Sequence, residues 1–160
     1  MRLLASVSDT SLGRYRGAAG SVAHYLARQN PAAAAQWALN LDDAQARKFA
    51  IGAVAREWAE ANAPAAGNWA MSLPQGKVRD AALTGLLYGI AEESIPDGTL
   101  LGAFSVDSAR TEASRGVVAI LAQRNRDDAR SWIESQIADP WEREQAERLL
   151  ETGAFKRGAR

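Results

Sequence analysis

The sequence predicts an all-α protein, an α-solenoid of stacked helix pairs, and two observations support this fold class. The first is composition: alanine dominates, supported by Leu, Glu, Arg and Gln, all strong helix formers, and no run alternates with the two-residue period of a strand. The second is a unit of about 32 residues that recurs about four and a half times. Repeats of this length are typical of helical arrays.

A column of arginines marks the repeat. Five arginines follow one another at intervals of 31 to 33 residues, an alanine stands three positions after each, and an apolar residue stands seven positions after each. Such spacings place the residues on one face of a helix. The arginines are Arg16, Arg47, Arg79, Arg110 and Arg143; the alanines are Ala19, Ala50, Ala82, Ala113 and Ala146; the apolar residues are Ala23, Val54, Leu86, Val117 and Leu150.

A column of tryptophans marks the second half of each unit. Trp37 and Trp69 are one period apart, Trp132 lies two periods further, and Leu101 takes the missing place. Seven residues before the tryptophans stand Asn30, Asn62 and Asn125, which are residues that favour helix N-caps. Each unit therefore predicts a long helix that begins near the arginine and a shorter helix that carries the tryptophan in the space between layers.

The start and stop signals place the helices along the chain. Long helices are expected over about 13–29, 43–62, 77–93, 107–124 and 140–152, and short helices over about 31–40, 64–72, 97–104 and 125–137. The expected caps include Asn30 before Pro31, Asp42 with Gln45, Asp107 or Ser108, and Asp139 before Pro140. Residues 1–13 are expected to be a partial repeat or lead-in, 14–152 a single solenoid domain, and 153–160 a basic flexible tail.

Small residues six positions after the arginines predict close packing of the long helices. Gly85 and Gly116 occupy this position in two units, although a glycine inside a helix costs roughly 1 kcal/mol relative to alanine. We therefore expect a neighbouring helix to contact each of them. Because a helix pair cannot bury both of its faces alone, the units are expected to stack.

Composition also limits the kinds of function. Lys plus Arg and Asp plus Glu are both 19, which argues against nucleic-acid binding through bulk positive charge. The chain has no cysteine, so disulfides and cysteine-ligated metals are excluded. Residues 3–7 are too short for a secretory leader, and no window approaches the roughly 18 apolar residues of a membrane span. The expectation is a soluble, cytoplasmic protein.

The pattern resembles the bacterial α-helical repeat arrays of the HEAT-like and tetratricopeptide-like type. The Arg-x-x-Ala columns, the helix starts at 30–34 and 63–66, and the Trp-Ala-x-x-Leu segments at 37–41 and 69–73 carry the resemblance over about 14–152. The period of about 32 differs from the 34 residues of the tetratricopeptide motif, and its Trp-x-x-Leu-Gly-x-x-Tyr signature is absent. The resemblance implies a binding scaffold.

Two sets of residues are candidates for a structural or a functional role. The arginine column together with Trp37, Trp69 and Trp132 is interpreted as a structural ladder, in which each arginine bonds carbonyls of the preceding short helix or an acid of the next layer. Reading of phosphates or acidic peptides by that column is the alternative. Residues flanking the tryptophans form a column on the short helices, expected to face a partner: Gln36, Asn40, Asn68, Ser72, Leu100, Phe104, Ser131 and Ser135.

The apolar pair in that column, Leu100 and Phe104, has two interpretations: a partner contact, or core residues of a unit whose register has shifted. His24 is the only histidine and is interpreted as structural. No catalytic, cofactor-binding or metal-binding motif is present, and no cofactor is expected. The expected function is a non-catalytic scaffold that binds another protein, a peptide or itself. The alternatives are a structural subunit that self-associates through its open ends or, less favoured, an enzyme or nucleic-acid-binding helical-repeat protein.

Overall fold

The computed structural model describes residues 9–153, and this part of the chain is helical, without strands. Predictions on residues 1–8 and 154–160 lie outside the described residues, as does the side chain of Arg16. The helices, in order, are α1 (Asp9–Gln29), α2 (Pro31–Leu39), α3 (Ala44–Ser72), α4 (Lys77–Glu93), the 3₁₀ helix η1 (Gly98–Ala103), α5 (Asp107–Arg124), α6 (Arg126–Gln136) and α7 (Pro140–Thr152).

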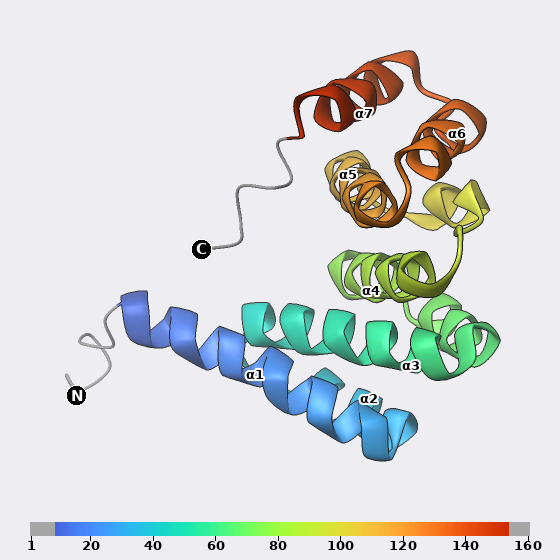
Figure 1. Ribbon diagram of the computed structural model, residues 1–160. Helices are drawn as coiled ribbons and strands as arrows, with labels where there is room; N and C mark the ends of the chain where they lie inside the picture. Colours follow the sequence, from blue (N-terminus) through green and yellow to red (C-terminus); the bar gives the residue numbers. More distant parts are fainter. Residues whose placement is uncertain (1–8, 154–160) are drawn as a thin grey trace.

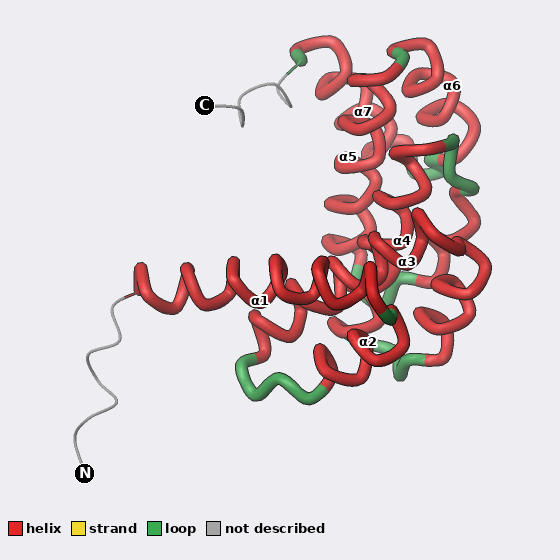
Figure 2. The backbone as a smooth tube through the Cα atoms, turned by 60° about the horizontal axis from the view of Figure 1, so that its bottom comes forward, coloured by secondary structure: helices red, strands yellow, loops and turns green. Residues whose placement is uncertain are grey.

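The long helices lie beside one another in chain order. α3 packs against both α1 and α4, α5 packs against α4, and α7 packs against α5. In Figure 1 this row runs from α1 to α7, while the second half of α3, η1 and α6 lie along one side of it. Figure 2 shows α1 reaching beyond its neighbours at the end of the row. Two hydrophobic clusters, one centred on α3 and one on α5, fill the interior.

α3 consists of two helices that meet at a kink at Asn62 (φ −160°, ψ 84°), two residues before Pro64, in agreement with the helices predicted over 43–62 and 64–72. Two details differ from the sequence-based expectation. The short helix of the third unit is a 3₁₀ helix of six residues. α1 begins at Asp9, about four residues earlier than predicted.

The helix caps agree with the prediction at three asparagines and differ from it at two other helix starts. Asn30 and Asn62 each accept a hydrogen bond from the backbone N–H three residues later, and Asn125 accepts one from the N–H two residues later. The acceptor that caps α3 is Asp43, not Asp42, because the Asp43 carboxylate reaches Ala46 N at 2.7 Å. α5 has Val106 at its N-cap, without a side-chain bond, so the prediction of Asp107 or Ser108 was wrong.

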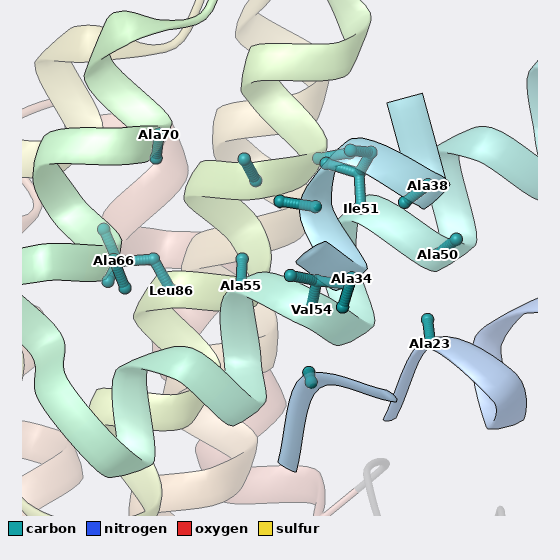
Figure 3. Packing of buried hydrophobic residues seen from close by; sticks show 14 of the residues in the cluster. Ala23, Ala34, Ala38, Ala50, Ile51, Val54, Ala55, Ala66, Ala70 and Leu86 are labelled. Carbon is teal, nitrogen blue, oxygen red and sulfur yellow. The ribbon is translucent and has the colours of Figure 1, made fainter. Parts of the chain in front are cut away.

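The small residues of the repeat occupy the interior. Every alanine at the third position after a column arginine and every apolar residue at the seventh is buried. Figure 3 shows the side chains of Ala55 and Leu86 in the packed space where α3 meets α4, beside Ala66 of the second half of α3. Helices with such small side chains at their contact can approach closely.

Gly85 is the closest point of that approach. A Cβ atom added at Gly85 would lie 2.0 Å from the carbonyl oxygen of Gly52, and one added at Gly89 would lie 2.5 Å from that of Arg56. At Gly116 an added Cβ would lie 2.0 Å from the hydroxyl of Tyr88. The two glycines that the sequence singles out, Gly85 and Gly116, therefore both face a neighbouring long helix.

The tryptophans pack against the hydrophobic clusters to different degrees. Trp132 is fully buried, and its Nε1–H donates to the carbonyl of Pro96 at 2.7 Å. Trp37 and Trp69 are half-buried against the first cluster. Trp69 stacks on Trp58 across the kink of α3, with ring centroids 5.5 Å apart, so this pair joins the two halves of the helix.

Candidate functional site

The arginine column is engaged mainly in contacts within the chain. Arg47 Nε donates to the carbonyl of Leu41 at 2.8 Å, and Arg143 Nη2 donates to the carbonyl of Ile137 at 2.7 Å. Both carbonyls lie six residues before the arginine, just after a short helix. These bonds satisfy backbone acceptors at a helix end, where carbonyls lack intrahelical partners.

The other described arginines of the column differ. Arg110 Nη2 donates to Glu142 of α7 at 2.8 Å, and the same Glu142 oxygen accepts from Thr111 Oγ1 at 2.8 Å. Glu142 is buried, so these hydrogen bonds compensate its lost hydration and join α5 to α7. The bond to Glu142 raises the pKa of Arg110. Arg79 Nε is buried without a hydrogen-bond partner.

The residues of the predicted column on the short helices differ in how far they are buried. Leu100 and Phe104 are half-buried and pack against both hydrophobic clusters, the environment of core residues. The six polar members are exposed and point away from the interior: Gln36, Asn40, Asn68, Ser72, Ser131 and Ser135. Asn40, Ser72 and Ser135 donate to carbonyls of their own helices, so part of this hydrogen-bonding capacity is used locally.

A large hollow of the described surface lies on the long helices. This groove has a volume of about 1160 Å³ and is lined by side chains from α1, α3, α4 and α5. A second hollow of about 580 Å³ lies between α5 and α7 and shares Ser108 and Glu112 with the first. The two hollows are therefore adjacent, and together they follow the row of long helices from α1 to α7. We refer to both together as the long-helix groove.

Small, aromatic and charged residues line the long-helix groove. Among the small residues, Gly20, Gly52 and Ala109 are half-buried, whereas Ala81 and Gly85 are buried where α4 meets α3. Larger apolar side chains stand along it: Phe49 is 53% exposed, Val106 43% and Trp141 60%. These apolar side chains are available for contact with a molecule that occupies the groove.

Charged residues of both signs line the groove. Lys48 and Lys77 are exposed and stand at the beginnings of α3 and α4. Arg56 pairs with Glu92 of α4 and lies 3.9 Å from Glu60. Burial raises the pKa of Glu60 above the ordinary value of 4.5, and the neighbouring Glu57 raises it further. Burial also raises the pKa of Tyr88, with Glu112 adding to the effect.

One carboxylate that lines the groove is buried, and one of its two oxygens has no hydrogen-bond partner. Asp80 is only 3% exposed; its Oδ1 accepts from Ser105 N at 2.8 Å, while its Oδ2 has no hydrogen-bond partner. The bond to Ser105 fixes the loop after η1 against the start of α4. Asp80 thus shapes the groove next to Lys77 and Val106, which line it from α4 and from that loop.

His24 lies in the groove as part of a contact between helices. Its Nδ1 is 2.9 Å from Glu57 of α3, and Arg28 Nε is 3.9 Å from the same carboxylate. The Glu57 side chain is 9% exposed, so the pair holds α1 to α3 in a partly dehydrated position. This is the structural role expected of the lone histidine.

The described residues contain no group of three or more His, Asp or Glu side chains arranged to hold a metal ion. Among the helices described, none is long and apolar enough to span a membrane.

Sequence reasoning missed the groove because it followed only the buried positions of the long helices. Many lining residues do recur at shared repeat positions: Phe49, Ala81 and Glu112 each follow a column arginine by two residues. Arg56 and Tyr88 each follow one by nine residues. The exposed Phe49 in an otherwise amphipathic long helix was the available signal. No protein-family model matches the chain, and no match is found among curated proteins or solved structures.

Proposed function

We propose that this chain is a non-catalytic protein-interaction scaffold built as a right-handed α-solenoid of about four and a half repeats, each about 32 residues long. The long-helix groove is the observation that carries the proposal. Its volume of about 1160 Å³ exceeds the 300–1,000 Å³ of small-molecule pockets, and its open, mixed lining suits a peptide segment of another protein.

The chemistry of the groove supports binding in preference to catalysis. Phe49, Val106 and Trp141 offer exposed apolar anchors to a partner. Lys48 and Lys77 add charges at the margin, where they guide orientation and association rate. Repeat scaffolds commonly use an extended surface of stacked helices in this way.

The polar column on the short helices is the second candidate surface for the same function. It is exposed at six positions, but it is neutral and lacks an apolar anchor, because Leu100 and Phe104 are half-buried. An interface normally has an apolar centre surrounded by a polar rim. The long-helix groove meets that requirement better.

Affinity capture with surface variants tests the proposal. The chain serves as bait in a lysate of its source organism, beside Phe49→Glu in the groove and Ser131→Arg on the short helices, both at exposed positions. A prey that binds the unmodified chain and Ser131→Arg but not Phe49→Glu supports the groove. A prey lost only with Ser131→Arg assigns binding to the short helices. Recovery of the bait alone would contradict the scaffold function.

A further inference from the structure

The described column arginines other than Arg79 bond to oxygen through the same edge of the guanidinium. In Arg110 and in Arg143, Nε and Nη2 both donate to the same oxygen atom. In Arg47, the same two nitrogens donate to two carbonyl oxygens. The edge that carries Nε and Nη2 is therefore the part of a column arginine that meets an oxygen acceptor.

At Arg79 this edge meets a sulfur atom. Nη2 of Arg79 donates to Sδ of Met71 at 3.2 Å, while Nε is buried without a hydrogen-bond partner. A thioether sulfur is only a weak acceptor. A buried donor without a partner costs free energy in the folded state. The Arg79 side chain is therefore left with a bonding capacity that an oxygen atom beside the sulfur would use.

Met71 is accessible to an oxidant in solution. It is 45% exposed in the last turn of α3, and it is the only methionine among residues 9–153. A methionine side chain is unbranched and flexible, so it adapts to its surroundings. An additional oxygen atom on the exposed sulfur can therefore be accommodated without the displacement of a helix.

We propose that Met71 is an oxidation site at which methionine sulfoxide supplies the oxygen acceptor that Arg79 lacks. Hydrogen peroxide transfers one oxygen atom to Sδ: a sulfur electron pair forms the S–O bond, the O–O bond breaks, and the other oxygen leaves as water with both hydrogens. Sulfur is oxidised and the peroxide is reduced. The sulfoxide oxygen then accepts from Nη2 and Nε of Arg79, as one oxygen atom does at Arg110 and Arg143. Oxidation thereby stabilises the junction between α3 and α4, and this inference does not depend on the scaffold function.

Oxidation with dilute hydrogen peroxide tests the proposal because the expected effect has an unusual sign. A sulfoxide ordinarily destabilises a packed chain, since it places a polar group in an apolar contact. Mass spectrometry should show one added oxygen atom at Met71. Urea unfolding of the oxidised chain should show a higher midpoint, with an unfolding equilibrium constant about tenfold lower. Absence of the sulfoxide, or a midpoint that is unchanged or lower, would overturn the proposal.

Two variants and one spectrum assign the effect to this pair of side chains. Met71→Leu retains Met1, so peroxide should leave its urea midpoint unchanged. Arg79→Leu retains Met71 without the guanidinium, and oxidation should no longer raise its midpoint. In the NMR spectrum of the unmodified chain, the Arg79 Nε–H resonance should move downfield on oxidation, because Nε gains an acceptor. A rise in the midpoint of Arg79→Leu as large as in the unmodified chain, or an unmoved Nε–H resonance, would refute the pairing. Neither result bears on partner capture by the groove.

Discussion

Replacing Gly85 by alanine tests whether the close contact between α3 and α4 holds the row of long helices together. In a solvent-exposed helix the change should stabilise, because alanine is favoured over glycine by roughly 1 kcal/mol. At Gly85 the new Cβ would lie 2.0 Å from the Gly52 oxygen and 3.0 Å from the Ala55 Cβ. The first neighbour is backbone inside a helix, so the clash can be relieved only by moving one helix away from the other.

The magnitude follows from these two opposing effects. Overpacking a tight core costs about 1–3 kcal/mol and occasionally more. The contact with a rigid carbonyl places Gly85→Ala near the upper end, so we expect a net loss of about 2–3 kcal/mol after the gain in helix propensity. For a chain of this size that loss lowers the melting temperature by roughly 4–12 °C.

Urea unfolding followed by tryptophan fluorescence and circular dichroism measures the free energy of unfolding. The matched control is Gly20→Ala in α1, where no atom lies within 4 Å of the added Cβ. This control should gain up to about 1 kcal/mol because it has the propensity effect without the clash. If Gly85→Ala is as stable as the unmodified chain, α3 and α4 do not approach as closely as described here.

Three further predictions concern other contacts. Trp132→Phe removes the indole N–H that donates to the buried Pro96 carbonyl and also leaves a cavity, because Phe lacks the second ring of the fully buried indole. Urea unfolding should therefore show a loss of more than about 1 kcal/mol, and Trp141→Phe at an exposed site should show almost none. Glu142→Ala removes the acceptor shared by Arg110 and Thr111 and should lower the free energy of unfolding by about 2–3 kcal/mol. Hydrogen exchange in this variant should show α7 opening before α4, and equal opening of the two helices would contradict this role of Glu142. Glu60→Gln should be more stable than the unmodified chain at pH 7, because a carboxyl whose folded pKa is raised favours folding only while it is protonated, and Gln resembles the protonated form. The difference in stability should disappear as the pH falls below 4.5. A difference that is independent of pH would refute the assignment.

The helices could be predicted well because their signals are local. Asn30 before Pro31 and Asp139 before Pro140 mark helix starts by chemistry that acts within one turn, and both caps are formed in the structure. The burial of Ala50 and Ala82 also follows from helical periodicity. The boundary between two helices at Asn62 was also predicted correctly, since Asn62 has non-helical φ and ψ and caps the helix that follows it.

The hollow itself could not be predicted because its shape depends on how whole helices are placed. The side chains that line it could have been related, since Phe49, Ala81 and Glu112 occupy the same repeat position on successive long helices. The contacts of individual arginines also depend on local geometry. Arg47 and Arg143 each donate to a carbonyl six residues earlier. The corresponding Arg79 has no hydrogen-bond partner for its Nε. Its helix, α4, begins after Gly76, which has a φ of 134° and provides no side-chain cap.

Lysine footprinting of the chain bound to its captured partner is the most direct test of the long-helix groove as the binding surface. The sequence has three lysines; Lys48 and Lys77 line the groove, and Lys156 belongs to the basic C-terminal segment. Binding should protect Lys48 and Lys77 from acetylation, measured by mass spectrometry, while Lys156 reacts as it does in the free chain. If Lys48 and Lys77 react equally with and without the partner, the groove is not the interaction surface.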